Sequence, residues 1–294
     1  MKQNNYGGQA VIEGVMMKGK DKMAVAVRKD EEEIVIKEKN LTFFGDKYSL
    51  LQLPFIRGVI ALISSLVTGI ESLSFSAGQV AEEEDEEIGV KEIILSIVIA
   101  FAFAILLFVA LPAFIISLIQ NYIEIDVILN LVEGLIKISA FLTYVFFISR
   151  INDIKRVFQY HGAEHKVIHN YESSLPLSIK NARTFTTLHP RCGTNFIFIV
   201  IILSIFFFSF FGRPPLLQRI LYHILLLPVI AGTSYEIIKL AGKKEANPLI
   251  KILSYPGLML QKLTTNEPDD SMLEVAMVAL NRVLPEEERG DLDV

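Results

Sequence analysis

The feature that most constrains the fold of this chain is a set of long apolar blocks. They begin near Ile93, Val127, Asn195 and Ile220. Each is close to the roughly 20 residues that a helix needs to cross about 30 Å of hydrocarbon. Over the 294 residues, 21% are charged, which is below the roughly 25% that is typical of soluble domains. The sequence therefore predicts an α-helical integral membrane protein.

The apolar blocks predict about four transmembrane helices, at residues 92–119, 127–149, 195–212 and 218–237. Pro112 and Pro228 lie inside two of them, and neighbouring helices in a membrane can accommodate such kinks. Residues 54–80 are apolar as well, but they include Arg57, Glu71 and many small residues. We therefore expect an amphipathic or re-entrant helix there rather than a full span.

Two segments outside the spans are predicted to fold outside the bilayer. Residues 1–50 contain alternating runs separated by glycines, which is typical of a small β-rich region. Residues 238–294 form a helical C-terminal tail, in which one helix is expected to start at Asp269, Asp270 or Ser271. In chain order, the predicted division is 1–50, 54–80, 92–149, 150–194, 195–237 and 238–294.

The distribution of positive charge predicts the orientation in the membrane. Lys and Arg gather in the 150–194 loop and after the last span, whereas the loop NYIEID has neither. The positive-inside rule then places both termini and the 150–194 loop in the cytoplasm. The net charge of −5 gives no support for nucleic-acid binding, which needs a basic face. The expected partner is the lipid bilayer. Association of several copies into a homo-oligomer is an alternative that the sequence leaves open.

Four of the five histidines lie between residues 161 and 189, and the single cysteine follows at 192. His161, His165 and His169 are spaced by four, so on a helix they share one face. Because His161 and His169 would be about 12 Å apart along the axis, only a neighbouring pair can share one metal ion. The segment from His161 to His165 also matches H-x-x-E-H, in which two histidines bind zinc and Glu164 activates water.

The sequence LHPRC offers two more metal ligands at the start of the third apolar block. A site built from His161, His165 and either or both of His189 and Cys192 would suit Zn²⁺, whose usual ligands are nitrogen and sulfur. Four protein ligands would make the site structural, whereas an open position would make it catalytic. Glu164 favours the catalytic alternative.

Other ionisable residues are candidates for further roles. His223 lies in the last predicted span, where ionisable groups are usually functional. Arg191 and Arg57 could hold an anionic group of a substrate. His169 remains a candidate for a role next to the metal.

Five motifs occur in order over nearly the whole chain: GGQAVIEGVMMKG, RGVIALISSLVTGIESLSFSA, YHGAEHKVIHNYE, LHPRCGTNFIFIV and PGLMLQKLTTNEPDD. Together they resemble the YqhQ-like family of bacterial integral membrane proteins, which are predicted to be metal-dependent enzymes. The resemblance implies a location in the bacterial inner membrane, but it supplies no substrate. The site residues that it implies are Glu13, His161, Glu164, His165, His189, Arg191 and Cys192, and also Thr264, Thr265 and Glu267.

These observations lead to three hypotheses. The first is a zinc-dependent membrane hydrolase that acts at the cytoplasmic face on a peptide bond or a lipid head group, with Glu164 as the base. In that hypothesis, the N-terminal strands with Glu13 and the segment TTNEPDD cover the site from two sides. The second is a transporter or lipid-handling scaffold with a structural metal site. The third is an assembly factor that binds partners through its soluble termini.

Overall fold

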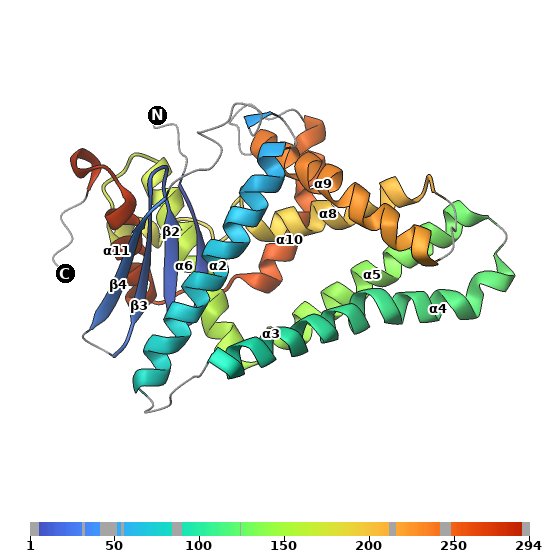
Figure 1. The fold of residues 1–294 in the computed structure, drawn as a ribbon. Coiled ribbons are helices and arrows are strands. Elements are labelled where there is room, and N and C mark those ends of the chain that lie inside the picture. The colour runs from blue at the N-terminus through green and yellow to red at the C-terminus, as the bar shows by residue number, and fades with distance from the viewer. Residues whose placement is uncertain are drawn as a thin grey trace.

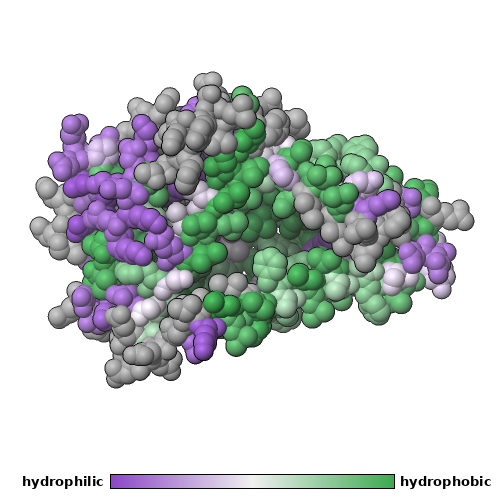
Figure 2. Space-filling view, viewed as in Figure 1, coloured by the Kyte–Doolittle hydropathy of each residue, from purple (hydrophilic) through white to green (hydrophobic). Residues whose placement is uncertain are grey.

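The computed structural model describes residues 6–30, 33–41, 52–53, 56–83, 90–123, 125–211, 216–241 and 248–289. The chain is mostly helical, with one small sheet near the N-terminus. The sheet and the helices that cover it form one end of the molecule, and a group of long helices extends from it (Figure 1). Hydrophilic side chains gather over the sheet end, whereas apolar side chains cover much of the helical end (Figure 2).

The predicted β-rich region is confirmed as a four-stranded antiparallel sheet in the order β1-β2-β3-β4. Its strands are β1 (Gly7–Val11), β2 (Gly14–Lys18), β3 (Lys22–Arg28) and β4 (Ile34–Asn40). Successive side chains of a strand point to opposite faces. Val15 and Met17 of β2 therefore join the larger core cluster, whereas Met16 joins a second cluster on the other face.

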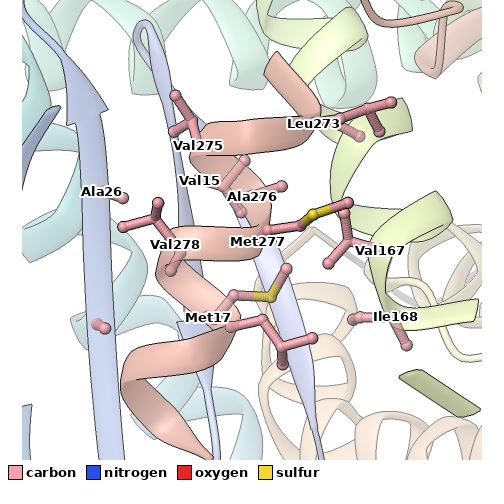
Figure 3. Packing of buried hydrophobic residues seen from close by; sticks show 14 of the residues in the cluster. Val15, Met17, Ala26, Val167, Ile168, Leu273, Val275, Ala276, Met277 and Val278 are labelled. Atoms are coloured by element: carbon pink, nitrogen blue, oxygen red, sulfur yellow. The ribbon is translucent and has the colours of Figure 1, made fainter. Parts of the chain in front are cut away.

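The larger core lies between the sheet, helix α6 (Asn152–Glu172) and helix α11 (Asp270–Val283). In Figure 3, α11 lies between the strands and α6, with Met277 next to Val167. The predicted start of α11 is correct, because Asp269 accepts a hydrogen bond from the Met272 backbone N–H at 3.0 Å. This helix is buried on most sides, because it packs against the sheet and α6 at once.

The other face of the sheet packs against helix α2 (Ile56–Glu83), which contributes Phe75 to the second cluster. The Ile12 backbone N–H donates to Ser76 Oγ at 3.2 Å, and Lys39 of β4 pairs with Glu71 at 2.6 Å. Figure 1 shows α2 running across the direction of α3 and α5. On its outer side, α2 exposes an apolar stripe, which comprises Ile63, Leu66, Val67, Ile70 and Leu73.

The helical end contains α3 (Val90–Ile105), α4 (Leu111–Ile119), α5 (Asp126–Ile148), α8 (Gly193–Phe208), α9 (Leu216–Ala241) and α10 (Pro248–Thr264). A π-helical turn at Leu106–Ala110 joins α3 to α4, just before Pro112. The short helix α7 (Ile179–Ala182) lies in the segment between α6 and α8.

Within the described ranges, three helices are long and apolar enough to cross a membrane: Ile56–Ala81, Ile94–Tyr122 and Asp126–Ile148. The second and third correspond to the spans predicted at 92–119 and 127–149. The span predicted at 195–212 is a shorter apolar helix. The span predicted at 218–237 coincides with α9, in which several side chains lie outside the described residues. These apolar helices indicate membrane association, and the first of them falls on residues 54–80, where the sequence predicted an amphipathic or re-entrant helix.

Candidate metal centre

Helix α6 places the H-x-x-E-H segment inside the molecule, next to the chain that follows α10. Gly162 makes this close approach feasible, because a Cβ at that position would overlap the carbonyl oxygen of Asn266. The Asn266 backbone N–H also donates to the carbonyl oxygen of Phe158 at 2.9 Å. The motif therefore lies where α6, the end of α10 and the loop before α8 meet.

Three side chains converge in this place. His161 Nε2 lies 3.1 Å from Cys192 Sγ, and the rings of His161 and His165 are 4.5 Å apart. One ligand atom from each of the three residues lies within 4.8 Å of the others. His161 Nδ1 donates to the carbonyl oxygen of Thr264 at 2.8 Å, and His165 Nδ1 donates to that of Thr187. These hydrogen bonds leave the Nε2 lone pairs available, as in metal-ligating histidines.

The donor set is chemically suited to a metal ion. Two imidazole nitrogens and one cysteine sulfur are ligands that Zn²⁺ prefers, and three protein ligands leave a fourth tetrahedral position open. Cys192 is 8% exposed and is the N-cap of α8, where its Sγ accepts a hydrogen bond from the Thr194 N–H at 3.4 Å. The residues that the structure brings together therefore fit the predicted zinc ion.

Glu164 lies beside this group of three. It is 4% exposed, and its Oε2 is 3.4 Å from His165 Nε2. Burial raises the pKa of the Glu164 carboxyl group, and nearby His161 opposes that shift. The Gly8 backbone of β1 lies close enough to lower the pKa of the carboxyl group, and a Cβ on Gly8 would lie 2.7 Å from Glu164 Cγ. The sheet therefore covers Glu164 by backbone contact.

His169, Glu172 and His189 form a neighbouring group, whose ligand atoms also lie within 4.8 Å of one another. His169 Nε2 donates to the carbonyl oxygen of Leu188 at 2.9 Å, and burial lowers the pKa of His169 to about 4. Glu172 forms an ion pair with Arg191. The structure therefore places His189 with His169, outside the group that contains Cys192.

A buried glutamine of α10 holds His189 in place. The His189 backbone N–H donates to Gln261 Oε1 at 2.7 Å, and Gln261 Nε2 donates to the His189 carbonyl oxygen at 2.8 Å. Sequence reasoning missed both Gln261 and Glu172. Glu172 follows His169 by three residues on α6, so helical spacing could have indicated it, whereas Gln261 carried no comparable signal.

Several predicted site residues support the centre from outside. Glu13 pairs with Arg156 and accepts from Tyr160 Oη at 3.3 Å, so the β1–β2 turn is held on α6 next to His161. Thr265 Oγ1 lies 3.3 Å from Thr187 Oγ1. These contacts position elements of the site rather than present a group to a substrate.

Two further candidates, Arg57 and Glu267, lie apart from the cluster in the part of the chain that the structure describes. Arg57 of α2 forms an ion pair with Glu236 of α9, with Nε 2.6 Å from Oε1. Glu267 is exposed and pairs with Lys166 at 2.8 Å. His223 belongs to α9, and its side chain lies outside the described residues.

Comparison with known proteins identifies the family of most of the chain. Residues 53–286 match the family described as "Protein of unknown function (DUF1385)". The chain is also 36% identical over 292 residues to the Bacillus subtilis (strain 168) protein described as "Uncharacterized protein YqhQ", covering 95% of this chain and 92% of that protein. No solved structure matches. The chain thus belongs to the DUF1385 family, together with YqhQ, as its five motifs predicted.

Proposed function

We propose that this protein is a zinc-dependent hydrolase at the cytoplasmic face of the bacterial inner membrane. One observation carries the proposal: two imidazole nitrogens, each oriented by a backbone carbonyl, converge with a thiol beside a buried carboxylate. His161, His165 and Cys192 would hold the ion. A divalent ion there supplies Lewis acidity, which polarises a carbonyl or phosphoryl group and activates water for attack.

Glu164 is the proposed general base. Its carboxylate accepts a proton from water as the water oxygen bonds to the carbon or phosphorus of the substrate. It then passes that proton to the leaving group as the scissile bond breaks. The Gly8 backbone of β1 packs against the carboxylate, and burial keeps bulk water away from it.

The position of the centre supports a substrate that meets the membrane surface. Cys192 directly precedes the apolar helix α8, so the centre lies where the sheet end joins the helical end. The apolar stripe of α2 is consistent with a helix that lies in the interface. The basic residues of the 150–194 loop favour the cytoplasmic side. A peptide bond or a lipid head group near the surface would be accessible from there.

Metal analysis and one isosteric substitution test the proposal. Purified wild-type protein should contain one zinc ion per chain, and His165→Ala should lose it. Glu164→Gln should keep the ion but lose hydrolysis, measured by mass spectrometry of products formed from a bacterial membrane extract. A wild-type protein without zinc would rule out the hydrolase. So would equal products from wild type and Glu164→Gln.

A lipid-handling scaffold with a structural metal site is the second candidate. An apolar groove of about 680 Å³ between α3–α4 and α5 favours it. The groove includes only a few polar side chains, among them Ser139 and Thr143. In this case zinc would still bind, and removing it would lower stability, but Glu164→Gln would have no effect on any product.

A further inference from the structure

The four clustered histidines differ in the hydrogen-bonding role of their ring nitrogens. Those of His161, His165 and His169 each donate an N–H to a backbone carbonyl oxygen. His189 does the opposite, because its Nδ1 accepts a hydrogen bond from the Arg191 backbone N–H at 3.3 Å. A ring nitrogen that accepts carries no hydrogen, so neutral His189 carries its hydrogen on Nε2. Three rings thus present a lone pair, and the fourth presents an N–H.

This N–H of His189 has no acceptor among the described residues. His189 is 4% exposed, and its Nε2 makes no hydrogen bond. The carboxylate oxygen Glu172 Oε2 lies 3.7 Å from His189 Nε2, which is beyond hydrogen-bond distance. A buried donor without a partner costs about 1–3 kcal/mol, so a buried N–H of this kind favours binding of an acceptor from outside the chain.

The surroundings fix this donor next to the candidate metal centre. The rings of His189 and His165 are 5.5 Å apart, and the two hydrogen bonds with Gln261 hold the His189 backbone. Burial lowers the pKa of His189, and the Glu164 carboxylate opposes that shift. Arg191 of the same loop is paired with Glu172.

We propose that His189 is a catalytic residue that donates its Nε2–H to an oxyanion of the substrate, and that it is not a metal ligand. This inference rests on the proposed hydrolase. The oxyanion is the oxygen of a carbonyl or phosphoryl group, on which negative charge develops as water adds. A fixed donor aimed at that charge stabilises the transition state, and a neutral imidazole can serve as such a donor.

Cobalt-substituted protein tests this assignment without the substrate. Wild type, His189→Ala and His189→Gln are loaded with Co²⁺, and inorganic phosphate or acetate is titrated while the visible absorption of cobalt is recorded. Glutamine is the matched control, because its amide can place an N–H near the Nε2 position but is a poor metal ligand. All three proteins should bind one Co²⁺ per chain. His189→Ala should bind at least one of the two anions about tenfold more weakly than wild type, and His189→Gln should stay close to wild type.

The other outcomes overturn the proposal in distinguishable ways. Loss of cobalt from both His189 variants would make His189 a metal ligand. Two results would mean that the His189 Nε2–H donates only to a buried water molecule. One is equal anion affinity in wild type and His189→Ala, and the other is no spectral response to either anion in the wild type. A wild-type protein that binds no cobalt would overturn the hydrolase and this inference together.

Discussion

Backbone carbonyl oxygens of Thr264, Thr187 and Leu188 each accept a hydrogen bond from a different histidine ring. These bonds decide which ring nitrogen keeps its lone pair, and thereby which nitrogen can bind a metal ion. The spacing of His161 and His165 was enough to predict that the two rings lie on one face of a helix, and the sharing of a metal ion by this pair stays a prediction. The tautomers were not predictable, because any residue type supplies a backbone carbonyl.

At the same scale, Gly8 and Gly7 form a matched pair for a test. We expect Gly8→Ala to destabilise the protein by about 1–3 kcal/mol, because the new Cβ would lie 2.7 Å from both Glu164 Cγ and Met16 O. Gly7→Ala should be nearly neutral, since nothing lies within 4 Å of its Cβ position. Thermal unfolding in detergent measures both variants. Equal melting temperatures would contradict the proposed contact between β1 and Glu164.

Asp269 should make a pH-dependent contribution to stability. Partial burial raises its pKa, but hydrogen bonds from Ser271 and Met272 outweigh burial and lower it overall. A lowered pKa stabilises the fold above the unfolded value of about 3.9, and that stability is lost as pH falls through the folded pKa. Asp269→Ala should cost about 1 kcal/mol at pH 7, with a smaller difference below about pH 4.

Asn is the control for this N-cap, because it keeps the hydrogen bond and lacks the charge. Asp269→Asn should retain most of the stability at pH 7 and should not show the loss on acidification. Chemical denaturation at several pH values compares the three proteins. An Asp269→Ala difference that stays constant down to pH 3 would contradict the role assigned to the carboxylate.

At the scale of elements, the close approach of α6 to the chain after α10 depends on Gly162. Gly162→Ala should destabilise the protein by about 1–3 kcal/mol, although alanine is the better helix former, because its Cβ would overlap the Asn266 carbonyl oxygen. Gly78→Ala in α2 should have the opposite sign and stabilise by up to about 1 kcal/mol, since its Cβ position is open. Thermal unfolding of both variants gives the comparison, and a stabilised Gly162→Ala would refute the close packing.

Helix α2 is the element whose relation to the membrane can be tested most directly. The chain has no tryptophan, so a single introduced Trp is a unique fluorescent probe. In liposomes, Leu66→Trp should be quenched by lipids brominated near the head group, because Leu66 is 56% exposed within the apolar stripe. Phe75→Trp, which would face the sheet, should not be quenched.

A third probe distinguishes an interfacial helix from a spanning one. Ile99→Trp lies on α3, within the candidate span Ile94–Tyr122, and should be quenched best by bromines deep in the acyl chain. If Leu66→Trp showed the same depth profile as Ile99→Trp, α2 would be a full span, and the prediction of an amphipathic helix would be wrong.

At the scale of the whole molecule, the candidate metal centre connects the sheet end to the helical end. His161 and His165 belong to α6, whereas Cys192 begins α8 and Thr264 ends α10. A ligand that binds only the folded state stabilises it by about 2.7 kcal/mol when its concentration is 100 times Kd. Chelation should therefore lower the melting temperature, and added zinc should restore it.

His165→Ala and Cys192→Ser serve as controls for this effect of zinc. Both variants should melt at the temperature of the chelated wild type, and zinc should not raise it. Differential scanning fluorimetry in detergent, with and without zinc, gives the comparison. A zinc-dependent rise of equal size in wild type and variants would show that zinc binds elsewhere.

Local patterns in the sequence were enough to determine much of this protein. Apolar blocks, strand alternation and capping residues predicted apolar helices, an N-terminal sheet and the start of α11, because each depends on neighbours along the chain. Helical spacing likewise predicted that His161 and His165 share one face. The number of spans was harder to predict, because Ile56–Ala81 includes Arg57 and Glu71 and is nevertheless long and apolar enough to cross a membrane.

Only the tertiary structure decided how these elements form a site. Cys192 joined His161 and His165, while His189 was placed with His169 and Glu172, through contacts between segments that are far apart in the sequence. The Gly8 strand over Glu164 was decided in the same way, since many residues lie between them. Such contacts depend on packing of the whole chain, and no local pattern of residues encodes them.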